Sequence, residues 1–291
     1  MSATLIATTA GLATAIAWGS ADYLGARSTR KLKPVQITLV TDIISITIAL
    51  VLFLIFGFHH LTLNQVVQIV VYDICLNVAY LTFLQALSKG AVGIVVPLGN
   101  IYAFFTLLLA LAFHQAHFST AEFTGMLVII FGAVVLAYEK NHRKLPLREL
   151  HHKTILALAA SLIWGVGFFI LNSVVSQVPW QTITITGEMT SVVLTCMLFS
   201  VLCRGSIVAS AKAALKTKVA YLNGVVGQAG MLAFYFGSHE ARNVVIPTVL
   251  STCGPLVASF WGRVLDAEKI GWLKRAGAVA VVAGIVILNL N

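Results

Sequence analysis

The chain has 291 residues, of which 59% are hydrophobic and only 10% are charged, and its formal net charge is +9. A soluble globular domain is about 25% charged, so this composition excludes an ordinary water-facing surface. In hydrocarbon every backbone polar group must be paired inside a helix or a closed barrel. Because the apolar runs are long and continuous rather than alternating, we predict an all-α integral membrane protein.

Ten apolar runs are long enough to cross a membrane, since a bilayer core of about 30 Å requires roughly 20 apolar residues per helix. The first run lacks a basic leader and is long for a signal peptide, so we interpret it as a span. The ten expected transmembrane helices cover residues 4–25, 35–57, 64–87, 91–113, 119–138, 154–176, 181–203, 217–239, 243–264 and 270–290.

A basic polar connector, residues 139–153, divides the chain into a first five-helix repeat, 1–138, and a second, 154–291. An offset of 146 residues carries Trp18 onto Trp164 and Asp42 onto Glu188, and an offset of 150 carries Pro97 onto Pro247. An odd number of spans per half makes the two halves enter the membrane from opposite sides. The sequence therefore predicts an inverted 5+5 repeat.

Basic residues lie almost entirely on one side of the predicted topology. The connectors after spans 1, 3, 5, 7 and 9, with the adjoining span ends, carry 18 of the 19 lysines and arginines, and only Arg242 falls on the other side. The positive-inside bias assigns the basic side to the cytoplasm. We therefore expect a multi-pass protein of the plasma (inner) membrane with extracytoplasmic termini. The basic excess reports topology, and we expect no nucleic-acid partner.

Asp42 and Glu188 are the candidates for proton or cation coupling. Each lies about seven residues inside its span, on the order of 10 Å at 1.5 Å per residue. A buried carboxylate costs a few kcal/mol on insertion scales, so it usually faces a polar cavity or a partner. The inverted repeat places one carboxyl near each face of the membrane. The alternative is a pair of structural carboxyls that are bonded to neighbouring serines or threonines.

Polar and aromatic residues on spans 3 and 8 predict a central substrate cavity. Asp73, Asn77 and Tyr80 follow one another at i, i+4 and i+7, so they form one stripe on a helix. The residues expected to line the cavity are Trp18, Asp73, Asn77, Tyr80, Asn100, Trp164, Asn223, Gln228 and Tyr235. The alternative reading is that these groups only hold helices together through hydrogen bonds.

Pro97, Pro247 and Pro255 are predicted to kink spans 4 and 9, because a proline inside a helix removes a backbone hydrogen bond. The freed carbonyls could line a cavity or form a hinge, although membrane helices also tolerate prolines without a function. No lysine or arginine lies at the middle of any span. An anionic substrate would be expected to meet a fixed cation, so a neutral or cationic substrate is favoured.

Four segments resemble the ten-span EamA-like branch of the drug/metabolite transporter superfamily. They are a Trp-Gly pair late in span 1 (AIAWGSADYLGARS), its echo in span 6 (SLIWGVGFF), and the Gly-rich fifth span of each half (GMLVIIFGAVVL and GAVAVVAGIVIL). The resemblance covers nearly the whole chain. It implies an inverted 5+5 bundle that works by alternating access, with a cavity bounded by spans 3, 4, 8 and 9 and contributions from spans 1 and 6. Many members place their termini inside, which differs from the orientation that the charges predict.

The expected function is secondary active transport of a small neutral or cationic metabolite, with proton coupling left open. A facilitative carrier or a channel is the alternative. An intramembrane enzyme is less favoured, because Tyr72-Asp73 resembles half of an aspartyl protease signature but no Gly-x-Gly-Asp follows. The expected partners are the lipid bilayer, the substrate and, if transport is coupled, protons. A homodimer is left open. We expect no cofactor, no catalytic residue and no metal site, since the four cysteines show no paired spacing.

Overall fold

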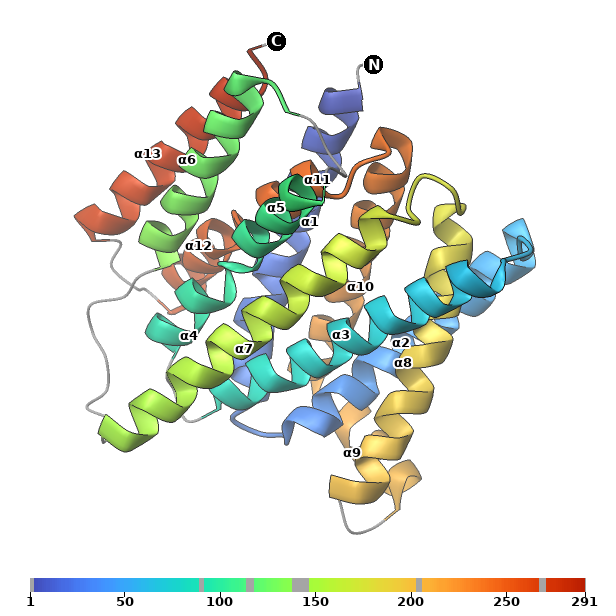
Figure 1. Ribbon diagram of the computed structural model, residues 1–291. Coiled ribbons are helices and arrows are strands. Elements are labelled where there is room, and N and C mark those ends of the chain that lie inside the picture. Colours follow the sequence, from blue (N-terminus) through green and yellow to red (C-terminus); the bar gives the residue numbers. More distant parts are fainter. Residues whose placement is uncertain are drawn as a thin grey trace.

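The computed structural model describes residues 3–88, 92–113, 118–137, 147–202, 206–266 and 271–290, and every regular element in these ranges is an α-helix. The helices run in one bundle, with the N- and C-termini at the same end (Figure 1). In chain order they are α1 (Ala3–Ser28), α2 (Pro34–Phe56), α3 (Leu63–Leu87), α4 (Val92–Gly99), α5 (Tyr102–Ala112), α6 (Thr120–Ala137), α7 (Leu147–Asn172), α8 (Trp180–Leu202), α9 (Ile207–Leu215), α10 (Lys218–Ala241), α11 (Val245–Ser251), α12 (Gly254–Asp266) and α13 (Trp272–Leu288).

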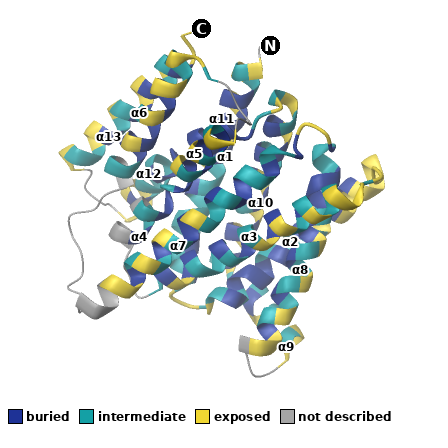
Figure 2. Cartoon of the chain, in the orientation of Figure 1, coloured by how far each residue is buried: buried dark blue, intermediate teal, exposed yellow. Residues whose placement is uncertain are grey.

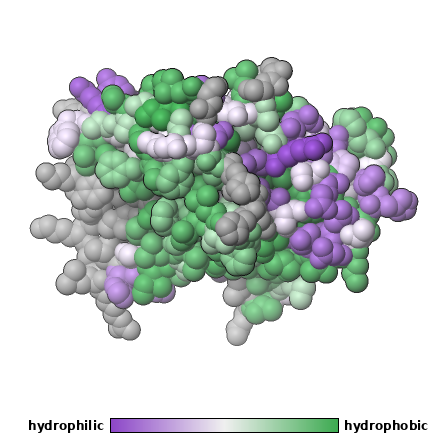
Figure 3. Space-filling view, turned by 45° about the horizontal axis from the view of Figure 1, so that its top comes forward, coloured by the Kyte–Doolittle hydropathy of each residue, from purple (hydrophilic) through white to green (hydrophobic). Residues whose placement is uncertain are grey.

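The outer surface of the bundle is apolar, as a lipid-facing surface must be. Buried residues gather where the helices cross, and exposed residues lie on the outward faces and at the helix ends (Figure 2). Large apolar side chains are among the exposed ones, including Leu54 at 74%, Phe131 at 68% and Val201 at 82% of full exposure. Figure 3 shows apolar residues covering most of one face, with hydrophilic residues toward its margins.

Seven candidate spans in the described residues are long and apolar enough to cross a bilayer, and α11 with α12 counts as one of them. The other six are α1, α2, α3, α7, α8 and α10. The three remaining expected spans contain shorter helices, namely α4 with α5, α6, and α13. The chain is therefore a multi-pass membrane protein.

Two helices are interrupted at corresponding places in the two halves. Pro97 lies in α4, and the chain leaves the helix at Asn100 before α5 begins. Pro247 lies in α11, and the interruption follows at Thr252 and Cys253. Pro255 was predicted to kink span 9 as well, but it is the second residue of α12. It therefore begins a helix, where its missing N–H breaks no hydrogen bond.

Helices of one half pack mainly against helices of the other. α1 packs against α10, and its repeat counterpart α7 packs against α3, the counterpart of α10. α2 packs against α8 and α6 against α13, so each of these pairs joins two counterparts. A methyl group added at Gly125 of α6 would lie 2.8 Å from the Gly284 carbonyl oxygen of α13. One added at Gly132 would lie 3.0 Å from the Gly277 oxygen, so the two helices cross in opposite directions.

The helix boundaries differ from the expected ones in the connectors. Helix α7 begins at Leu147, six residues before the end of the predicted connector 139–153. Lys153, expected in that connector, is buried, and its ammonium donates to the carbonyl oxygens of Ala86 and Ser88 at the end of α3. This cation favours the helix because free carbonyls leave a partial negative charge at a C-terminus. The short helix α9 lies in a segment that was expected to be a loop.

Candidate functional site

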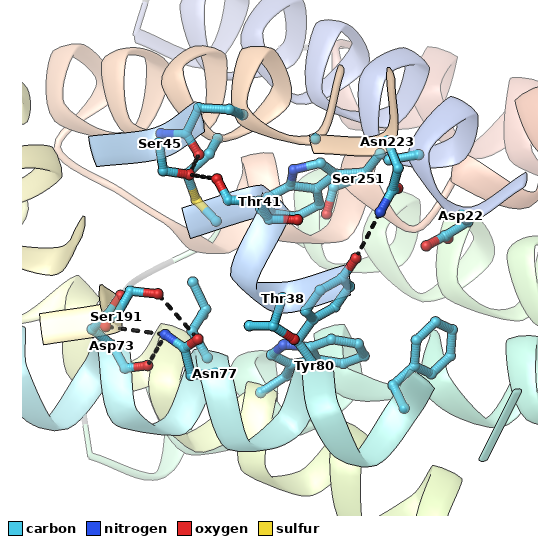
Figure 4. A pocket seen from close by; sticks show the side chains of 18 of the residues that line it. Asp22, Thr38, Thr41, Ser45, Asp73, Asn77, Tyr80, Ser191, Asn223 and Ser251 are labelled. Carbon is cyan, nitrogen blue, oxygen red and sulfur yellow. Dashed lines mark hydrogen bonds between the residues drawn. The ribbon is translucent and has the colours of Figure 1, made fainter. Parts of the chain in front are cut away.

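A cavity of about 180 Å³ lies at the centre of the bundle. It is bounded by residues of α1, α2, α3, α7, α8 and α10, and the interrupted helices contribute Gly99, Asn100, Tyr102 and Ser251. Figure 4 shows polar side chains from several of these helices pointing toward one another. The volume far exceeds the space that a single water molecule needs, so a small solute fits.

All eleven residues predicted for coupling or for the cavity line this one space. Nine are the predicted cavity residues, and the other two are Asp42 and Glu188. The three predicted prolines do not line it. The role of these residues in binding remains a prediction. Their convergence on one cavity from six separate helices is an observation of the structure.

A first network joins Asp42 of α2 to Asp73 of α3 through α8. The Ser191 hydroxyl oxygen lies 2.7 Å from Asp42 Oδ1 and 3.1 Å from Asn77 Oδ1. The Asn77 amide donates to Asp73 Oδ2 at 3.1 Å. All four side chains are buried, so each hydrogen bond replaces contact with water that burial has removed.

A second network surrounds Glu188 of α8. The Gln228 amide of α10 donates to Glu188 Oε1 at 2.8 Å, and the Ser45 hydroxyl of α2 donates to Gln228 Oε1 at 3.0 Å. Ser45 and Ser191 are counterparts at the offset of 146 that relates Asp42 to Glu188. Each carboxyl is thus linked to a serine of the opposite half, and each network uses an amide from α3 or α10.

The expectation that Asp42 and Glu188 lie near opposite faces is wrong, because both carboxyls line the same cavity. Each is the ninth residue of a 23-residue helix. Each therefore lies only three residues from the helix midpoint, or roughly 4.5 Å along the axis. Because α2 and α8 also pack against each other, the pair meets near the centre of the bundle.

Two further hydrogen bonds join opposite walls of the cavity. The Asn223 amide of α10 donates to the Tyr80 hydroxyl of α3 at 3.0 Å (Figure 4). The hydroxyls of Tyr102 and Ser251 lie 2.6 Å apart, which connects the start of α5 to the end of α11. Both interrupted helices are thus tied together beside the cavity.

Aromatic rings form the apolar part of the lining. The Trp18 ring stacks on Phe234 with centroids 5.4 Å apart and lies 6.2 Å from Phe168. The Phe168 ring lies 5.6 Å from Tyr102, whose ring is 5.8 Å from Trp164. Aromatic pairs at such separations favour tilted or edge-to-face geometry, and together they give the cavity a continuous aromatic wall.

Asp22 of α1 is a cavity residue that the sequence analysis missed. It lies close to the basic end of span 1, so it looks like an interfacial residue of the kind that usually meets water. One signal was present, since Asp22 follows Trp18 by four residues and therefore shares its helix face. Its carboxyl lies near enough to Tyr80 and Tyr102 for its charge to act on both hydroxyls.

Beside Asp22 and one turn further along, helix α1 is linked to α12 by Tyr23 and Arg27. The Tyr23 hydroxyl donates to Asp266 Oδ2 at 2.7 Å, and Arg27 forms an ion pair with the same carboxyl. Closer to the cavity, a methyl group at Gly19 would lie 2.2 Å from the Gly254 carbonyl oxygen, so only glycine permits this backbone approach. The cavity is therefore tightly closed along this seam.

The apolar exterior and the central cavity with its polar networks define a multi-pass helical membrane protein. The EamA-like transporter family model matches residues 5–138 and, a second time, residues 153–290. The chain therefore belongs to the EamA-like transporter family and contains two copies of the family's repeat.

A solved crystal structure shares this fold with a TM-score of 0.75, and the match covers 99% of this chain and 98% of that one. The two sequences are 18% identical, so the likeness concerns the fold alone. No curated protein matches the sequence.

Proposed function

We propose that the protein is a secondary active transporter that moves a small neutral or cationic metabolite across the plasma membrane by alternating access. The observation that carries this proposal is the meeting of two repeat-related carboxyls, Asp42 and Glu188, in one central cavity. A transporter of this kind binds its substrate near the bilayer midplane, at the interface of its repeats. Membership in a transporter family supports the same conclusion.

The proposed architecture is ten spans in two inverted repeats, in which α4 with α5 and α11 with α12 each form one span. The exchange of packing partners between halves supports it, because α1 meets α10 as α7 meets α3. The opposed crossing of α6 and α13 supports the inversion directly, since the first glycine of one helix meets the second glycine of the other. Alternating access would then rock one set of helices against the other around the cavity.

The proposed orientation places the basic ends of the helices in the cytoplasm and both termini outside. A cysteine introduced in place of Ser2 should react with an impermeant thiol reagent in intact cells. Labelling of a cysteine at His59 provides the control, because the α2–α3 loop lies on the same side in this topology. Protection of both sites in intact cells, with labelling after lysis, would reverse the orientation.

We further propose that Asp42 and Glu188 couple transport to protons. Each accepts a hydrogen bond inside the cavity, and the described residues that line the cavity include no fixed cation, so protonation is the available way to neutralise it. A proton that accompanies substrate movement contributes about 2.3 kcal/mol per charge per 100 mV of membrane potential.

The test uses Asp42→Asn and Glu188→Gln, which change charge with little change in size. In proteoliposomes with an imposed pH gradient, at least one variant should lose uphill accumulation while keeping substrate exchange at equal pH. Glu240→Gln at the exposed end of α10 is the matched control and should behave like the parent. If both cavity variants accumulate substrate as the parent does, coupling through this pair is excluded and an uncoupled carrier becomes the better description.

A further inference from the structure

Four carboxyls line the cavity, and among its described lining residues no lysine, arginine or histidine accompanies them. They are Asp22, Asp42, Asp73 and Glu188, from four different helices. A site with low-dielectric walls and one sign of charge attracts ligands of the opposite sign. The imbalance therefore favours a cation over a neutral solute and strongly disfavours an anion.

The protein does not supply hydrogen-bond donors to all of these carboxyl oxygens. Asp73 and Glu188 each accept from a side-chain amide. Asp42 is only 3% exposed, yet its Oδ2 has no hydrogen-bond partner among the described residues, although Thr195 stands beside this carboxyl. None of the described residues forms a hydrogen bond or an ion pair with the Asp22 carboxyl. Because buried polar atoms are almost always paired, the unpartnered Asp42 Oδ2 points to a ligand that brings donors or positive charge, and the partly buried Asp22 adds an accessible carboxyl to the same cavity.

Asp22 is separated from the other acids. In Figure 4 its carboxyl lies on the side of Asn223 and Tyr80, away from the group formed by Asp73, Asn77 and Ser191. Asp42, Asp73 and Glu188 each accept one hydrogen bond from a serine or an amide of these networks, whereas Asp22 lines the cavity outside them. A substrate cation and a transported proton can therefore use different carboxyls.

The repeat gives this acid an aromatic counterpart. The offset of 146 that relates Trp18 to Trp164 carries Asp22 of α1 onto Phe168 of α7, and both residues line the cavity. Phe168 belongs to the aromatic wall, where its ring lies 5.1 Å from Phe234. Aromatic faces attract organic cations and also bury apolar groups. Two symmetry-related positions thus offer one charged and one apolar contact.

We propose that the cavity binds an organic cation with an apolar body, whose positively charged nitrogen is held by Asp22 and whose body packs against Phe168 and the aromatic wall. This inference rests on the proposed function, because it names the substrate class of the same transporter. Binding itself, however, requires neither a gradient nor a coupled proton, so the two can be tested separately.

The experiment measures binding of benzyltrimethylammonium, a permanent cation that carries no transferable proton, to the purified full-length protein in lipid nanodiscs by calorimetry. Benzyl alcohol and phenylacetate are the neutral and anionic comparisons. The cation should bind at least about tenfold more tightly than either, since the attraction between one carboxylate and one cation near a protein surface contributes at least that much. Equal binding of benzyl alcohol, or no binding of the cation, would overturn the proposal.

Asp22→Asn should weaken cation binding at least about tenfold, and Phe168→Leu should weaken it severalfold through the lost ring. The exposed Glu240→Gln remains the control and should bind like the parent. A circular dichroism melt checks that each variant is folded, and if Asp22→Asn fails this check, Asp22→Ser, which also removes the charge, replaces it. Unchanged binding in a folded variant that lacks the Asp22 charge contradicts the assignment of Asp22.

Two further results separate this inference from the proposed function. Cation binding without pH-driven accumulation in proteoliposomes would retain the organic-cation site and exclude the coupling. Accumulation of a neutral solute by a protein that binds no cation would retain the proposed transport function and exclude the organic-cation site.

Discussion

The networks around Asp42 and Glu188 are built to the same plan but differ in charge. Each joins a carboxyl, a serine of the opposite half and an amide from the packing helix, α3 or α10. On α3 the network continues to a second carboxyl, Asp73. Its counterpart on α10 is Asn223, which bonds Tyr80 instead. The repeat thus preserves the scaffold of hydrogen bonds while the acids are distributed unequally, so the two halves are suited to different tasks.

Breaking the α3 network at its centre should have the largest effect. Ser191→Ala removes the partner of both Asp42 Oδ1 and Asn77 Oδ1, and it leaves neither oxygen of Asp42 with a hydrogen-bond donor among the described residues. We expect a loss of about 2 to 3 kcal/mol in the free energy of unfolding, because a buried charged group is then unsatisfied. Reversible unfolding in mixed micelles measures it.

The matched variant is Ser45→Ala, which removes one hydrogen bond to Gln228 and leaves the Glu188 bond in place. It should cost about 1 kcal/mol. Equal losses of unfolding free energy in Ser191→Ala and Ser45→Ala would contradict the unequal hydrogen bonding of the two networks.

Asp73→Asn makes the α3 network resemble its α10 counterpart and tests the unequal charge. The amide can still bond Asn77, so the unfolding free energy should change by less than about 1 kcal/mol. Binding of benzyltrimethylammonium should weaken severalfold, because one of the four cavity carboxyls is lost. If binding is unchanged and only stability falls, Asp73 serves packing alone.

Tyr80→Phe should have the smallest effect. It deletes the acceptor for the Asn223 amide and keeps the ring, so we expect a loss of about 1 kcal/mol in stability. Cation binding should be nearly retained, since the aromatic face remains. A large loss of binding would assign the Tyr80 hydroxyl, rather than its ring, to the site.

The sequence carried enough information to predict the helical membrane fold and most of the cavity. Acids such as Asp42, Asp73 and Glu188 stand out inside apolar runs because lipid tolerates them poorly. Asp22 did not stand out, since it lies near a basic span end where acids are common. The tertiary crossing of α2 with α8, which brings their carboxyls together, has no signature within either span.

The interruptions of the two helices could likewise be predicted only in part from the sequence. Pro97 and Pro247 indicate where the two helices are weakened, but the interruptions come several residues later, at Asn100 and Thr252. Their exact place depends on packing around the Tyr102–Ser251 hydrogen bond, which joins residues that are 149 positions apart. Local sequence gives the tendency to bend, and only the assembled bundle fixes where the bend occurs.

The packing of α1 against α10 has a consequence for how the protein is made. These two helices are among the least apolar of the candidate spans, and each is the other's main packing partner. Helix α1 ends at Ser28, whereas α10 begins only at Lys218. At translation rates of about 5–20 residues per second, the newly made α1 waits roughly 10 to 40 seconds for its partner. During biosynthesis the first span must therefore remain in the membrane, or in the insertion machinery, before the half of the chain that stabilises it has emerged.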